Sequence, residues 1–276
     1  MSIPNSQPVI NLNAGIPIPQ LGLGVYQAET GREAYEAVLT ALELGYRHID
    51  TASIYGNEVD VGRAVRDCGL PRNDVFVVTK VWTKDQGYDQ TLRACERSLE
   101  LLGLDHVDLY LIHWPKPDTR KDTWRALERL AREGMTRSIG VSNYTIRHLE
   151  QLMATANTPP AVNQVEFHPF LYQRALLDFC KKNDIALEAY SPLTRGERLN
   201  APVIRAIAHK HGASPAQVLI AWCLTLGTIT IPKTVQRARL AENFESIQLK
   251  LDAEDMEQLC SLDEGLRICW NPDELP

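Results

Sequence analysis

The 276-residue sequence lacks the features of several large protein classes. No apolar run approaches the roughly 20 residues that a membrane-spanning helix needs. The six cysteines, at positions 68, 95, 180, 223, 260 and 269, form no C-x-x-C motif, which disfavours a disulfide scaffold or a zinc site. The N-terminal MSIPNSQPVINLN has neither the basic nor the apolar region of a secretion signal. We therefore expect a cytoplasmic protein with no metal and no membrane association.

Positive charge and phosphate-binding motifs are also scarce. Lys and Arg number 29 against 35 Asp and Glu, a net charge of −6, whereas nucleic-acid binders cluster basic residues. Gly22 and Gly24 are followed by no third glycine three residues on, so the dinucleotide motif G-x-G-x-x-G is absent. No Walker A, H-E-x-x-H or G-x-S-x-G motif occurs. These absences disfavour nucleic-acid binding, nucleotide hydrolysis, zinc proteolysis and α/β-hydrolase chemistry.

Short apolar runs alternate with longer amphipathic segments. Runs such as VFVVTK (75–80) and DLYLIH (108–113) are continuously apolar, which is typical of parallel strands covered by helices. Strands are predicted at 21–24, 48–50, 75–80, 108–113, 138–142, 162–166, 186–190 and 228–231. Helices are predicted at 33–44, 91–102, 124–132, 146–154, 174–182, 203–210, 215–226 and 239–244.

This order of elements predicts an α/β fold, a (β/α)8 TIM barrel. Residues 9–20 (VINLNAGIPIPQ) alternate around an Asn-Ala-Gly turn and predict an N-terminal β-hairpin that plugs the barrel. The length also allows two average domains or a doubly wound sheet, but no linker or low-complexity tract divides the chain. We therefore expect a single domain over residues 1–276.

Polar residues stand where successive predicted strands end. They are spaced by about one β/α unit and comprise Asp50, Lys80, His113, Ser142–Asn143, Gln164–Glu166 and Tyr190–Ser191. In a barrel these strand ends converge on the C-terminal face, where barrel active sites lie. An Asp50–Lys80 ion pair alone has a purely structural explanation, as a charged cap on the core. The regular placement of the whole group favours chemistry.

Eight segments, in order and over essentially the whole chain, resemble the aldo-keto reductase family. They are LGLGVY (21–26), GYRHIDTASIYGNEVDVG (45–62), VVTKVW (77–82), DHVDLYLIHWP (105–115), IGVSNY (139–144), NQVEFHP (163–169), AYSPL (189–193) and IPKTVQRARLAEN (231–243). The short loop 116–123 and short tail are most similar to bacterial 2,5-diketo-D-gluconate and methylglyoxal reductases. The resemblance implies an NADPH-dependent oxidoreductase acting on CH–OH groups, which reduces aldehydes and ketones by hydride transfer without a Rossmann domain.

The resemblance also implies catalytic roles. The residues that match the family's catalytic four are Asp50, Tyr55, Lys80 and His113. Tyr55 would be the general acid that protonates the carbonyl oxygen. Lys80, held by Asp50, would lower the pKa of Tyr55, and His113 would orient the carbonyl. His48 and His168 match no catalytic position, so structural roles are expected for them.

The remaining matches concern the cofactor and the substrate. The nicotinamide of NADPH would contact Ser142, Asn143, Gln164 and Tyr190, and the pyrophosphate would contact Ser191 and Leu193. The 2′-phosphate and adenine would lie near Lys233, Thr234, Arg239, Glu242 and Asn243. The residues that would wall the substrate pocket are Tyr26, Trp82, His113 and Trp114, with Trp270 of the tail as a further candidate.

Three alternatives stay open. The basic residues 233, 237 and 239 also fit a solvated surface patch. A non-catalytic NADPH-binding regulatory subunit of the same fold, like the barrel-shaped β-subunits of potassium channels, would carry similar motifs. Oxidation of an alcohol cannot be separated from reduction, because direction follows the cofactor ratio. We expect a monomer whose partner is a small carbonyl or keto-sugar, such as methylglyoxal or 2,5-diketo-D-gluconate.

Overall fold

Eight parallel strands form the centre of the computed structural model, which describes residues 7–13 and 15–275. In sheet order they are β3 (Leu23–Gly24), β4 (His48–Asp50), β5 (Phe76–Val81), β6 (Val107–Ile112), β7 (Thr136–Ser142), β8 (Val162–Glu166), β9 (Ala186–Tyr190) and β10 (Ile229–Thr230). A parallel bridge between Leu21 and Thr230 joins the two edges, so the sheet closes on itself. The predicted (β/α)8 barrel is confirmed.

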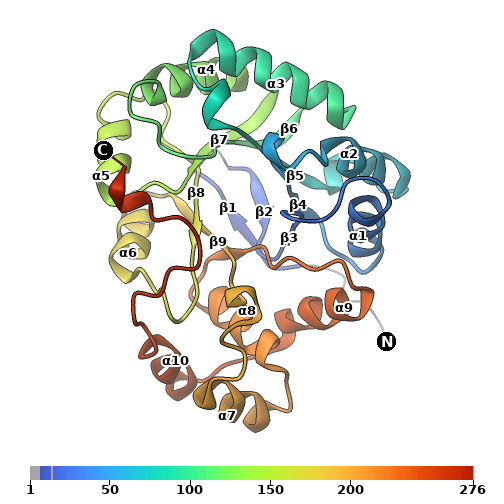
Figure 1. Cartoon of the computed structure of the whole chain (residues 1–276), viewed down its shortest axis with the longest axis vertical. Coiled ribbons are helices and arrows are strands. Elements are labelled where there is room, and N and C mark those ends of the chain that lie inside the picture. Colours follow the sequence, from blue (N-terminus) through green and yellow to red (C-terminus); the bar gives the residue numbers. More distant parts are fainter. Residues whose placement is uncertain (1–6, 14, 276) are drawn as a thin grey trace.

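Helices surround the sheet (Figure 1). Eight agree with the predicted positions to within a few residues: α1 (Arg32–Glu43), α3 (Tyr88–Leu102), α4 (Arg120–Arg132), α5 (Ile146–Met153), α6 (Arg174–Lys182), α7 (Pro202–His211), α8 (Pro215–Thr225) and α9 (Arg237–Glu245). Two more were not predicted, α2 (Glu58–Asp67) and α10 (Ala253–Cys260). A glycine interrupts the apolar face of α2, and it is there because a Cβ at Gly62 would collide with the carbonyl of Leu102. The start of α10 carries a capping box between Asp252 and Asp255, a signal that the sequence does contain.

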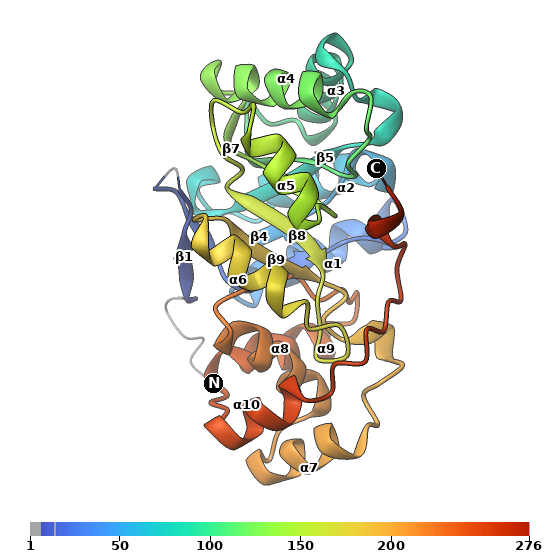
Figure 2. The same ribbon diagram turned by 90° about the vertical axis from the view of Figure 1, so that its left-hand side faces the viewer.

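An N-terminal hairpin, β1 (Val9–Asn11) and β2 (Pro17–Pro19), closes one end of the barrel. Its buried Leu12 and Ile18 pack in one apolar cluster with inward residues of the strands, such as Val78 and Leu109. Figure 2 shows the hairpin on one side of the barrel and the C-terminal segment on the other. The predicted hairpin is confirmed, although Ala14 in its turn lies outside the described residues.

The segment after α10 crosses the opposite, C-terminal face of the barrel (Figures 1 and 2). The carboxylate of Glu166, at the end of β8, accepts the backbone N–H groups of Ile268 and Cys269 at 2.7 and 3.1 Å. Farther on, the carbonyl of Leu275 lies 3.1 Å from Nε2 of His148 and accepts a bond from Arg147. This segment, called the tail below, is therefore fixed at two points.

None of the helices among the described residues combines the length and the apolar character that a membrane-spanning helix needs.

Candidate active site

The strands change from apolar to polar along the inside of the barrel. In β5, every second residue faces inward, and Phe76 and Val78 belong to the apolar cluster of the hairpin end while Lys80 follows beyond it. The inward series of β9 likewise runs from Ala186 through Glu188 to Tyr190. Strand periodicity therefore delivers the polar side chains to one end, beneath the tail.

Lys80 connects the candidate catalytic residues. Its side chain is fully buried, and Nζ donates to Oδ1 of Asp50 at 2.6 Å and to the carbonyl of Thr51 at 2.8 Å. The hydroxyl of Tyr55, carried on a single 3-10 turn (Ser53–Tyr55), lies 3.4 Å from Nζ. All three ammonium hydrogens thus have an acceptor. The structure thus brings three of the four expected catalytic residues, Asp50, Tyr55 and Lys80, into one hydrogen-bonded group, here called the candidate catalytic group.

The electrostatics of Tyr55 differ from the expectation. Burial raises the pKa of its phenol well above 10.0, and the neighbouring Asp50 carboxylate raises it further. The net pKa shift is therefore opposite to the expected lowering, because loss of hydration and the charge of Asp50 dominate. The phenol keeps its proton throughout the neutral range, which is the form that can donate.

His113 follows directly after β6 and faces the same space. Burial lowers the pKa of its imidazole well below 6.5, and Lys80 lowers it further, so the ring is neutral at neutral pH. The ring stands edge-on to Tyr55 and to Trp82, with centroids 5.8 and 5.0 Å away. A neutral imidazole beside the phenol can donate a hydrogen bond without adding a charge.

Aromatic side chains border this space toward solvent. Tyr26 is half exposed and packs against Tyr55 at a centroid distance of 5.0 Å. Trp114 packs against Trp270 of the tail at 5.7 Å, and Trp270 remains 69% exposed. Of the expected pocket residues, Tyr26 thus contacts Tyr55 and Trp82 contacts His113, while Trp114 contacts Trp270 of the tail.

The ends of β7, β8 and β9 form a second hydrogen-bonded group. The hydroxyl of Ser142 donates to the Gln164 carbonyl at 2.9 Å, and Nδ2 of Asn143 donates to the His113 carbonyl at 3.0 Å. The Tyr190 hydroxyl donates to Oδ1 of Asn143 at 2.8 Å. Asn143 and Ser191 adopt left-handed backbone angles, with φ of 64° and 51°, a strained conformation for non-glycine residues that is concentrated at functional sites. These residues, all expected to hold a nicotinamide or pyrophosphate, adjoin the candidate catalytic group through the His113 carbonyl.

The residues expected to bind the adenosine part lie on the loop after β10 and on α9. Lys233 and Arg239 are exposed, and among the described residues neither has an ion pair, whereas Arg237 pairs with Glu43 at 3.0 Å. Thr234 and Asn243 are buried. Glu242 accepts a bond from the Ser214 hydroxyl. The loop and the first turn of α9 thus present two cations, Lys233 and Arg239, that have no ion pair among the described residues, while Arg237 pairs with Glu43.

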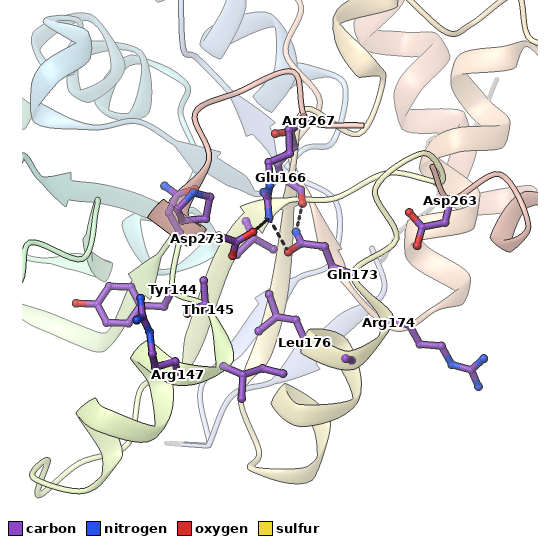
Figure 3. A pocket seen from close by; sticks show the side chains of 15 residues that line it. Tyr144, Thr145, Arg147, Glu166, Gln173, Arg174, Leu176, Asp263, Arg267 and Asp273 are labelled. Carbon is purple, nitrogen blue, oxygen red and sulfur yellow. Dashed lines mark hydrogen bonds and ion pairs between the residues drawn. The ribbon is translucent and has the colours of Figure 1, made fainter. Parts of the chain in front are cut away.

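A separate cavity of about 640 Å³ lies beneath the tail (Figure 3). Asn143 lines it, but Tyr55, Lys80 and His113 do not. Arg267 reaches Gln173 at 3.4 Å and Asp273 at 3.5 Å, and Gln173 donates to the Glu166 carbonyl at 2.6 Å. This cavity is therefore lined in part by the tail, through Arg267, Pro272 and Asp273, and does not include Tyr55.

The carboxyl groups of Glu166 and Glu188 are buried on β8 and β9, and the sequence assigned neither a specific role, although Glu166 belongs to the strand-end group. Glu166 holds the tail, as described above. Glu188 is fully buried and accepts a hydrogen bond from Nε2 of Gln164 at 3.0 Å, while the same nitrogen donates to Asp50 at 2.8 Å. The signal for Glu188 is present in the sequence, because it shares the inward face of β9 with Tyr190.

Comparisons with known proteins identify the family of this chain. A model of the aldo/keto reductase family matches residues 20–264. Glyoxal reductase of Bacillus subtilis (strain 168) is 49% identical over 266 residues, 96% of each chain, and methylglyoxal reductase DkgA of Yersinia pestis is 45% identical over 271 residues, 97% of each chain. The crystal structure of a Gox0644 variant in complex with NADPH is 42% identical, with a TM-score of 0.93, and the match covers 99% of this chain and 100% of that one. The chain belongs to the aldo/keto reductase family.

Proposed function

We propose that this chain reduces aldehydes and ketones to alcohols with NADPH, and that Tyr55 is the general acid. The observation that carries the proposal is the fully buried Lys80, which donates to Asp50 and lies 3.4 Å from the Tyr55 hydroxyl. A buried ion pair that also contacts a protonated phenol next to the half-exposed Tyr26 is typical of a catalytic site.

The residues present fit NADPH. The family's nicotinamide and pyrophosphate positions are occupied here by hydroxyl and amide groups at the ends of β7, β8 and β9, where the left-handed Asn143 and Ser191 hold strained backbone. Lys233 and Arg239 offer two solvated charges near Thr234, and a dianionic 2′-phosphate matches that set. When bound, NADPH supplies the hydride. Ser142, Asn143, Gln164 and Tyr190 would hold its nicotinamide.

The chain's own groups act on the substrate oxygen. A carbonyl that gains a hydride develops negative charge on oxygen, and donors aimed at that charge lower the barrier. Tyr55 releases its proton to this oxygen, and Lys80 stabilises the phenolate that remains. The neutral imidazole of His113 donates a hydrogen bond that orients the oxygen. Because burial raises the pKa of Tyr55, the proton stays on the phenol until the oxygen becomes basic.

We further propose a small carbonyl substrate of the methylglyoxal or 2,5-diketo-D-gluconate type. The loop between β6 and α4 is short, and the nearest tail aromatic, Trp270, is itself mostly exposed to solvent. The relatives named for glyoxal and methylglyoxal reduction support the same class. An aromatic border of this kind also accepts aromatic aldehydes.

The test is a steady-state assay that follows NADPH absorbance with methylglyoxal, 2,5-diketo-D-gluconate and an aromatic aldehyde. We expect consumption with at least one of them and the highest kcat/KM for a dicarbonyl or keto-sugar. Binding of NADPH without consumption across a broad carbonyl panel would instead identify a regulatory binding subunit.

A further inference from the structure

A continuous series of polar contacts runs through the barrel interior. It begins at the hairpin end, where Nδ1 of His48 lies 3.2 Å from the carbonyl of Pro19. Nε2 of the same ring lies 3.3 Å from Oε1 of Glu188. The series continues through Gln164 to Asp50, Lys80 and Tyr55. His48 and Glu188, both fully buried, thus connect the hairpin end with the candidate catalytic group.

The protonation of His48 follows from its partners. The Pro19 carbonyl can only accept, so Nδ1 of His48 carries the hydrogen. Burial lowers the pKa of His48 to about 4, so the ring is neutral and Nε2 is an acceptor. Oε1 of Glu188 is the neighbouring atom, and neither it nor Nε2 has a hydrogen-bond partner among the described residues. A proton on Oε1 would satisfy both atoms.

The charges around Glu188 lead to the same assignment. It faces His48 and Asp50 from β4, Lys80 from β5 and Gln164 from β8, with Tyr55 beyond. Lys80 and Asp50 already neutralise each other at 2.6 Å, so a second carboxylate would be an uncompensated buried charge. Burial, and then the charge of Asp50, raise the pKa of Glu188 to about 8.

The consequence reaches Gln164. Both oxygens next to its Nε2, Oδ2 of Asp50 and Oε2 of Glu188, are acceptors, so the two amide hydrogens are committed and the orientation of the amide is fixed. Among the described residues, no hydrogen bond involves Oε1 of Gln164. That oxygen is therefore the acceptor left for a ligand.

We propose that Glu188 is a positioning residue that shares a proton with His48 and, together with Asp50, holds the Gln164 amide so that its oxygen is presented to the carboxamide of the cofactor. The proposal rests on the proposed use of NADPH. It concerns the protonated form of Glu188, which donates to His48 through Oε1 and accepts from Gln164 through Oε2.

Two substitutions separate this role from a merely structural one. Glu188→Gln keeps the pattern, because the amide oxygen accepts from Gln164 and the amide nitrogen donates to His48. Glu188→Leu removes both bonds. Glu128→Gln is the matched control, since Glu128 is a buried carboxyl that accepts the N–H groups of Asn157 and Thr158 away from this series. Fluorescence titration with NADPH near neutral pH should show the E188Q and E128Q affinities within about twofold of the unaltered protein and the E188L affinity at least about tenfold weaker. Equal losses in E188Q and E188L, or no loss in E188L, would overturn the proposal.

A second readout needs neither NADPH nor turnover. The folded-state pKa of Glu188 lies above its unfolded value of about 4.3, so its proton stabilises the fold at low pH and this contribution is lost as pH rises through about 8. E188Q lacks this loss. Above about pH 5, His48 is neutral in the folded state of both proteins and titrates alike when they unfold, so it cancels from the comparison. From there, the denaturation midpoint of E188Q should rise relative to the unaltered protein and level off above about pH 8. A constant difference across this range would show that Glu188 is ionised throughout.

The two readouts also separate the proposals from each other. If NADPH binds and no carbonyl is reduced, the proposed function fails while the affinity comparison still tests Glu188. If E188L does not fold, E188Q and its pH dependence decide the proposal alone.

Discussion

The candidate catalytic group and the loop that carries Lys233 are built in opposite ways. Lys80 is fully buried, and its ammonium has three oxygen acceptors, including Asp50. Lys233 and Arg239 are exposed, and no ion pair among the described residues includes either. One lysine is fixed in advance, and the other cations remain solvated.

The difference reflects the tasks proposed for the two regions. A group that stabilises charge during a reaction acts best from a fixed, water-excluded position. Cations that bind an anionic ligand from solution need not first break an ion pair if they are unpaired. Leaving them unpaired costs the fold little, because an exposed ion pair contributes only about 0–1 kcal/mol. Substitutions in the buried group should therefore affect chemistry and stability, and substitutions in the exposed loop should affect cofactor affinity alone.

The largest effect is expected from Tyr55→Phe. Removing the hydroxyl removes the proton donor, and loss of a general acid lowers turnover by about 10²–10⁴-fold. The ring remains, so contacts with Tyr26 and His113 persist and the NADPH affinity should stay within about twofold. Steady-state assay and fluorescence titration measure the two quantities. Retained turnover would exclude Tyr55 as the acid.

The buried ion pair gives the next effect. Lys80→Met leaves Asp50 as an uncompensated buried charge, which lowers the free energy of unfolding by about 3–5 kcal/mol. Urea denaturation measures this loss. The double variant Lys80→Met, Asp50→Asn removes both charges and should recover part of the stability while activity stays low. A single variant as stable as the unaltered protein would show that the Lys80 region tolerates exchange as the exposed loop does.

The sequence predicted the barrel well because its signals are periodic. The bounds of β4, β8 and β9 agree with the predicted strands, and the continuously apolar runs at β5 and β6 were placed to within one residue. The helix α2 was missed because Gly62 serves a contact with Leu102 that only the folded chain reveals. Likewise, their positions at strand ends placed Asp50, Lys80 and His113 on one face of the barrel. The distances between their side chains depend on the folded chain and could not be predicted.

Electrostatics was the weaker part of the prediction. An ammonium beside a phenol suggested a lowered pKa for Tyr55, but the balance depends on burial and on Asp50, which are three-dimensional properties. Glu188 shares the inward face of β9 with Tyr190, which is a signal in the sequence, but it was overlooked because it has no local partner. Its partners, His48 and Gln164, lie on two other strands.

Arg239→Ala tests the exposed cations, since Arg239 lies in the first turn of α9, directly after the loop that carries Lys233. Loss of a charged hydrogen-bond donor to the 2′-phosphate costs about 1.5–3 kcal/mol, so the KM for NADPH should rise by about 10–100-fold. The KM for NADH, which lacks this phosphate, should change little, and stability should be unaffected. Arg237→Ala is the matched control, because Arg237 already pairs with Glu43. Equal rises in the KM for NADPH and NADH would instead indicate that Lys233 and Arg239 are only a solvated basic patch.

The smallest effect is expected where the tail meets the barrel. Trp270 is 69% exposed and packs on Trp114 at a centroid distance of 5.7 Å. An aromatic pair contributes about 0.5–1.5 kcal/mol, so Trp270→Ala should raise the KM for an aromatic aldehyde by about 2–10-fold. The KM for methylglyoxal, which has no ring to pack, should stay unchanged, as should kcat. Val9→Ala, an exposed apolar residue on the hairpin at the other end of the barrel, is the control and should change neither. A similar rise in KM for both substrates would mean that Trp270 acts by positioning the tail, which Glu166 holds. Trp270 would then resemble the buried Lys80, whose position is fixed in advance, more than the solvated Lys233.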